Sequence, residues 1–507
     1  MYHSNPPSQP AASKNRRLPW RIIPLSSAVR RRLSARLSWR LSRSNHVRLT
    51  ICSQFFPPDF AATGQLLHDL SERLARKGLQ VQVLTGQPAY AFNRADAERI
   101  EFLPNLCVRR TRVSRLWPKR IRGRAVNGLL FCIRVFVRLL RFSRRGDLML
   151  YTTEPPYLPI LGWMVHRLTG TPYILVLYDL YPDVLEELKV LSSGHPLVRV
   201  WRRLNSLAVR NAKEVIVLSH AMTVRVRRHC PEIGDRLAVV PSWANPYAIR
   251  PREREANPFA RRHGLEGKFV VLYSGNQGRC HDLVTLLAAA LLLRHEPDVQ
   301  FLFIGGGPQN DRLRELVADW GLTNCRFLPY QEPSVLPYSL SCADVAVVSL
   351  GIDAEGLVAP SKLYGHLAAG TPIAAITPRG SALQELVLNS GCGAWFANGD
   401  AETLAAWIRR LRDHPEEARR YGDAARNLLF ASASPERVTR QYMALIQRHL
   451  PADKALHPLP LQTRSDDRRD DDRRSGHDPV AALMAGQERR QLQRRLGERR
   501  FPNDRLR

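Results

Sequence analysis

Short apolar runs rich in β-branched residues alternate with amphipathic segments along most of this chain, and the alternation begins twice. In the first half the expected strands are 47–52, 79–85, 148–151, 173–177 and 214–218, and in the second they are 269–274, 299–304, 325–328, 344–349 and 373–376. Apolar strands separated by helices are typical of parallel sheets that are covered on both faces. We therefore expect an α/β fold of two doubly wound, Rossmann-like domains that face each other across a cleft. Ligands of such sheets bind beyond the carboxyl ends of the strands.

Length and composition agree with two domains. A chain of 507 residues, 44% of them hydrophobic, is too long for one ordinary core. Proline residues mark the stretch 241–258 as a linker. The predicted organisation is a basic, poorly ordered extension at 1–47, a first Rossmann-like domain at 48–245, a second Rossmann-like domain at 246–432, a closing helix at 433–450 and a charged, poorly ordered tail at 451–507.

The charge balance restricts the partners. The formal net charge is +30, and residues 1–47 contain ten Lys or Arg and no acidic residue. Such a chain suits anionic partners, namely phosphorylated substrates, anionic lipid or nucleic acid. Basic and aromatic residues do not interleave as in nucleic-acid-binding motifs, so we do not expect nucleic acid as a partner.

Cysteine spacing and hydropathy bear on the compartment. The eight cysteines are scattered singly, without the spacing of a metal site, which predicts no metal and a reduced, cytoplasmic setting. No apolar run reaches the roughly 20 residues that span a bilayer. We expect a cytoplasmic protein that at most lies peripherally on the inner face of the cell membrane.

The segment DAEGLVAPSKLYGHLAAGTP is the most informative part of the chain. It follows an expected strand and contains Glu355, Ser361 and Lys362. Ser361 is placed to cap a helix over 363–369 that Gly370 ends. A helix N-terminus with a lysine beside it favours a diphosphate, although Ser361 by itself is equally an ordinary capping residue.

This segment resembles the donor-site signature of the GT4 family of retaining glycosyltransferases, and in particular the colanic acid and exopolysaccharide subgroup, which carries PSK-L-Y near an AAG-x-P ending. The resemblance implies a GT-B fold and a UDP- or GDP-linked sugar as donor substrate, with no cofactor and no metal. It also implies retention of configuration and a glycan or polyprenyl-diphosphate-linked acceptor. By the same resemblance Glu355 is the catalytic acid facing the donor sugar. The second glutamate of the family pattern falls at Gly365, where it is absent.

Two segments of the first half extend the resemblance. QFFPPDFAATGQLLHDLSERLARKG is similar to the first loop and helix of the subgroup, in which a glycine, here Gly64, approaches both substrates. LYDLYPD is similar to the acceptor-side motif, so Asp179 and Asp183 would orient sugar hydroxyls. Asp183 is equally placed to cap a helix over 184–189.

Two segments of the second half concern the donor. In YSGNQGRCHDL, Gly275 and Gly278 allow a close approach to a ligand, and Arg279 and His281 would neutralise the diphosphate. A solvated Arg279 is the alternative. In FLPYQEP, Tyr330 would stack on the nucleotide base or simply pack against the protein.

One basic segment stands apart from these motifs. Arg134, Arg138, Arg141 and Arg145 follow each other at intervals of four, three and four, which places them on one stripe of a helix that is otherwise apolar. The stripe would meet anionic headgroups or a lipid diphosphate, or it is the solvated face of a core helix.

The predicted function is transfer of a sugar from a nucleotide diphosphate sugar to an acceptor hydroxyl. A sugar-nucleotide epimerase or phosphorylase on the same fold remains an alternative, because architecture does not fix chemistry. A basic nucleic-acid-binding protein is a third, less favoured possibility.

Overall fold

The computed structural model describes residues 48–59, 61–88, 97–112, 121–143, 147–187, 189–192 and 194–450. The basic extension expected at 1–47 and the charged tail expected at 451–507 lie outside the described residues, as does Arg145.

In the described part of the first half, eight strands form one sheet in the order β3-β4-β2-β1-β5-β6-β7-β8. All neighbours are parallel except β3 and β4, which form a hairpin. The strands are β1 (Arg48–Cys52), β2 (Gln80–Thr85), β3 (Ile100–Leu103), β4 (Leu106–Arg110), β5 (Leu148–Thr152), β6 (Tyr173–Leu177), β7 (Glu214–Val217) and β8 (Leu237–Val239). The hairpin and β8 were not expected, since β3 and β8 are only partly buried and carry a weaker apolar signal.

Helices cover this sheet because their apolar faces pack into its core. They are α2 (Ala62–Arg76), α3 (Ile121–Phe142), α4 (Leu158–Thr169), α5 (Asp183–Glu187), α6 (Pro196–Asn211), α7 (His220–His229) and the 3₁₀ turn η1 (Pro231–Arg236). Helix α2 begins at Ala62, so Gly64 lies in its first turn.

The second half contains a six-stranded, fully parallel sheet in the order β11-β10-β9-β12-β13-β14, counted over the described residues. Its strands are β9 (Phe269–Asn276), β10 (Val299–Gly306), β11 (Cys325–Leu328), β12 (Val345–Ser349), β13 (Ile373–Ile376) and β14 (Gly393–Phe396). Its helices are α8 (Pro258–Arg262), α9 (Val284–Leu292), α10 (Asn310–Asp319), α11 (Leu336–Leu340), η2 (Ile352–Ala354), α12 (Lys362–Ala369), α13 (Ala382–Ser390), α14 (Ala401–Asp413) and α15 (Pro415–Ser432).

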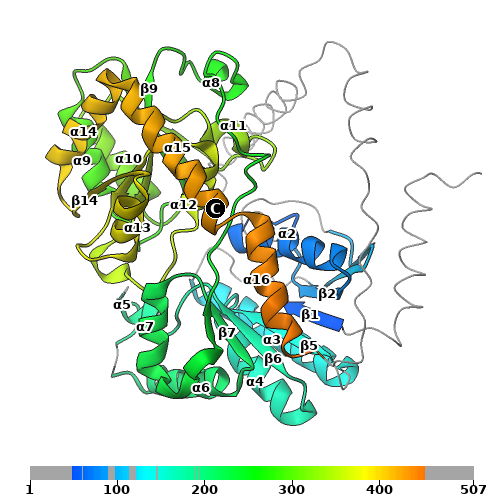
Figure 1. Cartoon of the computed structure of the whole chain (residues 1–507). Helices are drawn as coiled ribbons and strands as arrows, with labels where there is room; N and C mark the ends of the chain where they lie inside the picture. The colour runs from blue at the N-terminus through cyan, green and yellow to red at the C-terminus, as the bar shows by residue number, and fades with distance from the viewer. Residues whose placement is uncertain are drawn as a thin grey trace, which may run out of the picture.

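The last helix, α16 (Pro435–Gln447), returns to the first half (Figure 1). It lies beside α2, and its buried side chains Val438, Tyr442 and Ile446 belong to the first half's core. The ring of Tyr442 meets that of Trp243 edge-on at 6.4 Å. The expected closing helix is therefore part of the N-terminal core, and the chain crosses between the halves twice.

The loop that follows β12, here named the junction loop (350–361), joins the two halves. Leu357 is buried in the core of the first half. The backbone of Val358 forms a β-bridge with Asp179, and the N–H of Leu180 donates to the carbonyl of Leu357 at 3.0 Å. The residues just beyond β6 and just beyond β12 therefore meet, as expected for two sheets whose ligands bind at their carboxyl ends.

Candidate active site

In the second half of the chain, two glycine turns lie at the carboxyl ends of β9 and β10. Gly275 and Gly305 have φ of +136° and +132°, a conformation that side chains disfavour. A Cβ at Gly305 would lie 2.1 Å from the carbonyl oxygen of Gly275. A Cβ at Gly275 would lie 2.6 Å from Cε of Lys362, so a side chain there would displace the lysine from the turn. At Gly278 the nearest atom is a side-chain nitrogen of Asn276 at 3.1 Å, a milder restriction.

Lys362 is the first residue of α12, and its side chain is held against the turn. Its Nζ lies 2.9 Å from Nε2 of His281 and 5.3 Å from the ring centroid of Tyr273. Nδ1 of His281 lies 2.7 Å from the carbonyl oxygen of Ser349, which can only accept, so Nδ1 carries the hydrogen. Nε2 is then an acceptor, and the ammonium group of Lys362 donates to it.

The electrostatics of this pair favour an anionic ligand. Burial lowers the pKa of His281 to about 3, with a smaller contribution from the charge of Lys362, so the imidazole is neutral. Burial lowers the pKa of Lys362 to about 8. No acidic side chain in the described ranges forms an ion pair with Lys362. The lysine is therefore a desolvated cation without a counter-charge, which a phosphate group would supply.

Other predicted donor residues surround this pair with different roles. Ser361 is exposed and does not cap α12: its φ and ψ of −57° and −23° are already helical, so its hydroxyl is not turned toward the first N–H groups. The capping prediction is wrong for that reason, and Gly370 does end the helix in the left-handed conformation. Arg279 is exposed. The hydroxyl of Tyr330 donates to the carbonyl of Gly306 at 3.0 Å, which places its ring along the β10 turn.

Glu355 sits in the junction loop and is tied to both halves. Its Oε1 accepts from the N–H of Ala382 at 2.9 Å, at the N-terminus of α13. Its carbonyl oxygen accepts from the guanidinium of Arg225 in α7 at 3.2 Å. The position of the missing second glutamate, Gly365, lies within α12, where a Cβ would approach Cδ1 of Leu340 to 3.0 Å. A longer side chain there would face an apolar neighbour.

Across the junction, two carboxyl groups lie at the ends of adjacent strands. Asp179 follows β6, and burial raises its pKa to about 6. Glu154 follows β5, and its pKa is raised to about 8 by burial and by the charge of Asp179. Glu154 was not among the sequence-predicted site residues. The signal that would have identified it is its place directly beyond a buried strand next to the strand that carries Asp179.

Gly64 lies close to this pair, at a point of tight packing. A Cβ there would lie 3.1 Å from backbone atoms of Phe55 and Phe56, so the glycine lets α2 approach that loop. The preceding residue, Thr63, donates its hydroxyl to Oε1 of Glu154 at 3.0 Å.

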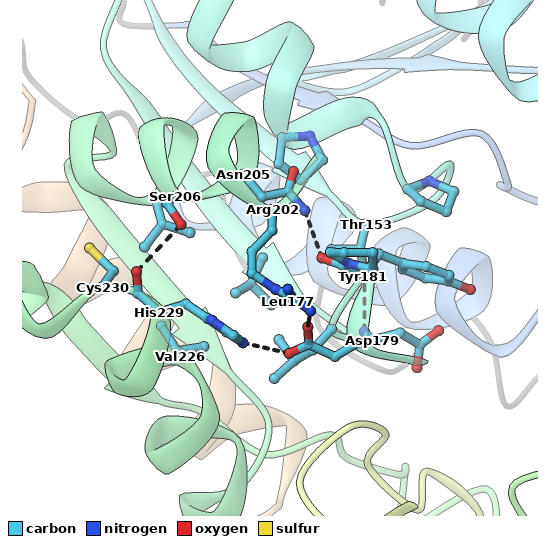
Figure 2. Close-up of a pocket in the computed structure, with 16 residues that line it drawn as sticks. Thr153, Leu177, Asp179, Tyr181, Arg202, Asn205, Ser206, Val226, His229 and Cys230 are labelled. Carbon is cyan, nitrogen blue, oxygen red and sulfur yellow. Dashed lines mark hydrogen bonds and ion pairs between the residues drawn. The ribbon is translucent and has the colours of Figure 1, made fainter. Parts of the chain in front are cut away.

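Asp183 does not share the position of Asp179. Its carboxylate accepts from Nε2 of His229 at 2.8 Å and from Arg202 at 3.4 Å, and not from a backbone N–H of α5. These groups line a cavity of about 60 Å³ between α5, α6 and α7. Figure 2 shows Asp179 and Thr153 at one end of this cavity and His229 at the other.

Cys280 follows β9, and its carbonyl oxygen accepts from the N–H of Gly351 in the junction loop at 2.8 Å. The pKa of its thiol is raised by burial and by the charge of Asp179, and lowered by Lys362. The acceptor-side carboxylate and the donor-side cation therefore both affect the pKa of this one thiol.

Three further observations hold for the described residues. They contain no group of three His, Cys, Asp or Glu suited to a metal ion, no disulfide, and no helix long and apolar enough to cross a membrane.

Both halves match models of known families. A model of the glycosyl transferases group 1 family matches residues 256–428, and a model of the glycosyl transferase 4-like domain matches residues 62–243. Glycosyltransferase WbjE of Pseudomonas aeruginosa is 28% identical over 280 residues, which cover 54% of this chain and 68% of WbjE. The colanic acid biosynthesis glycosyl transferase WcaI of Escherichia coli is 24% identical over 410 residues, which cover 76% of this chain and 97% of WcaI.

Solved structures share the fold. Sucrose-phosphate synthase from Thermosynechococcus elongatus superposes with a TM-score of 0.64 at 20% identity, covering 80% of this chain and 99% of that one. Anabaena HepE, solved in complex with UDP-glucose, superposes with a TM-score of 0.58 at 15% identity, and the match covers 80% of this chain and 100% of HepE.

Fold and family models together define the class of this protein: it is a glycosyltransferase with GT-B architecture. Each half matches a glycosyl transferase model, and the chain is a GT4-type glycosyltransferase that resembles the colanic acid subgroup. Because both matched families are glycosyl transferases, they favour sugar transfer over the epimerase, phosphorylase and nucleic-acid-binding alternatives.

Proposed function

We propose that this enzyme transfers a sugar, with retention, from a UDP- or GDP-linked donor to a hydroxyl of a glycan or polyprenyl-diphosphate-linked acceptor. One observation carries the donor proposal: Lys362 is a desolvated cation without an acidic partner in the described residues, and it crosses a glycine turn at the carboxyl end of β9. HepE, solved with UDP-glucose, supports a nucleotide sugar as the ligand of this fold.

The chemistry assigned to the donor side follows from charge. When the bond between the anomeric carbon and the diphosphate breaks, negative charge develops on the leaving oxygen. Lys362 and the N-terminus of α12 would stabilise it, and exposed Arg279 would add a second cation. Tyr330 would support the base, and Glu355 would face the sugar from the N-terminus of α13. Asp179 would orient the acceptor hydroxyl from the other half.

The biological setting is proposed by similarity. WcaI is described as a colanic acid biosynthesis enzyme, which supports a role for this chain in exopolysaccharide or other cell-surface polysaccharide synthesis. Such acceptors are often membrane-linked, which suits a cytoplasmic protein that contacts the inner face of the cell membrane.

Helix α3 supplies a surface for that contact, although not the one expected. Its outer stripe is apolar, with side chains 37 to 50% exposed: Val126, Leu129, Ile133, Val137 and Leu140. The arginine stripe lies to one side: Arg134 donates to the carbonyl of Arg112 at 2.9 Å, Arg138 lies over the ring of Phe142, and Arg141 is exposed. An exposed apolar stripe with flanking cations fits the interface of an anionic lipid layer.

Nucleotide binding tests the donor proposal directly. Thermal unfolding should be measured with UDP, GDP, ADP and the corresponding sugars, for wild type, Lys362→Ala and Lys268→Ala. Lys268 lies at the opposite end of β9, where its Nζ donates to the carbonyl of Pro297, so it is a matched control. We expect one nucleotide to raise the melting temperature of wild type and Lys268→Ala, and Lys362→Ala to lose at least about tenfold in affinity, the equivalent of one charge-assisted contact. Equal affinity in Lys362→Ala would refute the phosphate role.

A further inference from the structure

The chain holds Glu154 and Asp179 together through their backbone. Strands β5 and β6 are parallel neighbours in register, with Thr152 opposite Val176, so the residues that follow them emerge side by side. The hydroxyl of Thr153 accepts from the N–H of Asp179 at 3.3 Å and from that of Tyr178 at 3.1 Å. The two loops are thereby fixed to each other, and Asp179 is also bridged to the junction loop.

The two oxygens of the Glu154 carboxyl group differ. Oε1 accepts from Thr63 at 3.0 Å. Oε2 is shielded from solvent and has no hydrogen-bond partner in the part of the chain that the structure describes. A buried polar atom left without a partner costs about 1–3 kcal/mol, so its presence calls for a ligand or a functional reason. Oε2 is therefore the atom of Glu154 that is available to form a hydrogen bond with a hydroxyl group of a bound ligand.

The charges around Glu154 come from several elements. Asp59, in the loop after β1, and Asp179 both raise its pKa, and Thr63 lowers it. Burial raises the pKa of the Tyr178 and Tyr181 phenols, with a smaller contribution from the charge of Glu154. With its pKa near 8, Glu154 keeps its proton at pH 7, whereas Asp179, near 6, is ionised. One group is then a hydrogen-bond donor and the other an acceptor.

We infer that Glu154 is a second acceptor-binding residue, which together with Asp179 binds neighbouring hydroxyl groups of an acceptor sugar. The neutral carboxyl of Glu154 donates to one hydroxyl oxygen, and the carboxylate of Asp179 accepts from a hydroxyl hydrogen. The β-bridge from Asp179 to Val358 places this pair beside the junction loop, which leads directly to Lys362 and the proposed diphosphate site. The inference rests on the proposed function and names the acceptor group as a sugar hydroxyl rather than a phosphate.

Binding of methyl glycosides tests the pair without the natural acceptor. Saturation-transfer NMR with methyl glucoside, galactoside, mannoside and N-acetylglucosaminide should be recorded at pH 7 and pH 9 in the absence of nucleotide, because Lys362 also titrates near pH 8. The proteins are wild type, Glu154→Gln, Asp179→Asn and, as control, Glu232→Gln, an exposed acid paired with Arg210. The amide oxygen introduced by Glu154→Gln would still accept from Thr63, and melting curves check that each variant folds.

We expect wild type and Glu232→Gln to bind at least one glycoside at pH 7 and about tenfold more weakly at pH 9, one unit above the pKa of Glu154. Glu154→Gln should keep its binding at both pH values, since an amide remains a donor. Asp179→Asn should bind more weakly at both, since a neutral amide oxygen is a poorer acceptor than a carboxylate. The inference fails if no glycoside binds wild type, if wild-type binding is the same at both pH values, or if Glu154→Gln loses binding with pH as wild type does. UDP and GDP binding to the same samples separates this from the proposed function, which fails only if neither nucleotide binds.

Discussion

At the scale of single residues, Lys362 makes nucleotide binding dependent on pH. Its pKa is lowered from the ordinary lysine value to about 8 because the protein around it disfavours the charged form. Below pH 8 the ammonium group is charged and can bind a diphosphate, and above pH 8 it loses its proton. We therefore predict that affinity for the nucleoside diphosphate is constant from about pH 6.5 to 7.5 and falls up to about tenfold by pH 9.

Isothermal titration of the nucleotide across this pH range measures the effect. Lys362→Met is the control, since it lacks the titrating group and should bind weakly at every pH. His281 does not contribute, because its pKa of about 3 keeps it neutral throughout. A flat profile in wild type, or the same slope in Lys362→Met, would contradict the assignment.

At the scale of elements, the N-terminus of α13 couples Glu355 to stability, in addition to the catalytic role proposed for this residue. Ser381 caps the helix through its hydroxyl, which accepts from the N–H of Gln384, and Glu355 accepts from another free N–H of the first turn, that of Ala382. We predict that Glu355→Ala lowers the free energy of unfolding by about 0.5–2 kcal/mol, the usual cost of losing a cap. Glu355→Gln should keep this hydrogen bond and most of the stability.

Comparison of these variants separates the two roles. Glu355→Ala and Glu355→Gln should both lower turnover strongly if the charge of Glu355 acts on the donor sugar. Urea unfolding measures the stability of each variant, and a sugar-transfer assay measures its turnover. Full activity in Glu355→Gln would show that Glu355 serves only α13.

Helix α3 makes a second prediction at this scale. We expect Ile133→Gln with Val137→Gln to reduce flotation with anionic vesicles by about tenfold or more, because the transfer of apolar surface into lipid is lost. Arg141→Gln should weaken only the binding to anionic vesicles, in a manner that salt reduces.

The matched control for α3 is Leu197→Gln with Val200→Gln on α6. These two side chains are at least as exposed, at 66% and 57%, and lie on another helix. Equal flotation of wild type and the α3 variant would exclude this surface.

At the scale of the whole molecule, α16 ties the end of the folded chain to its beginning. Tyr442 is fully buried against Trp243, and its hydroxyl has no partner among the described residues. We predict that Tyr442→Ala lowers the free energy of unfolding by about 3–5 kcal/mol through the cavity it leaves. Tyr442→Phe should be neutral or stabilising, because it removes an unsatisfied polar group.

Denaturant unfolding followed by tryptophan fluorescence reports these changes. Arg440→Ala, at an exposed position of the same helix, should stay within about 0.5 kcal/mol of wild type. A small effect of Tyr442→Ala would mean that α16 does not hold the first half together.

The sequence by itself determined the two-sheet α/β fold, because strand and helix periods are local properties of the chain. Strands β6, β11 and β13 begin and end at the expected residues, and the others predicted differ by one or two. The sequence also allowed the glycine turns and the lysine at the start of α12 to be predicted, since left-handed backbone conformations and helix starts have local sequence signatures.

Only the tertiary structure decided which of these residues meet. Contacts such as Lys362 with His281, Glu355 with Ala382 and Glu154 with Thr63 join segments that are 27 to 91 positions apart. The same is true of α16, whose apolar face carries no mark of the half it will join. Burial and long-range pairing are properties of the packed chain. They bring Glu154, which no sequence signal had singled out, close to Asp179, and they pair Asp183 with His229.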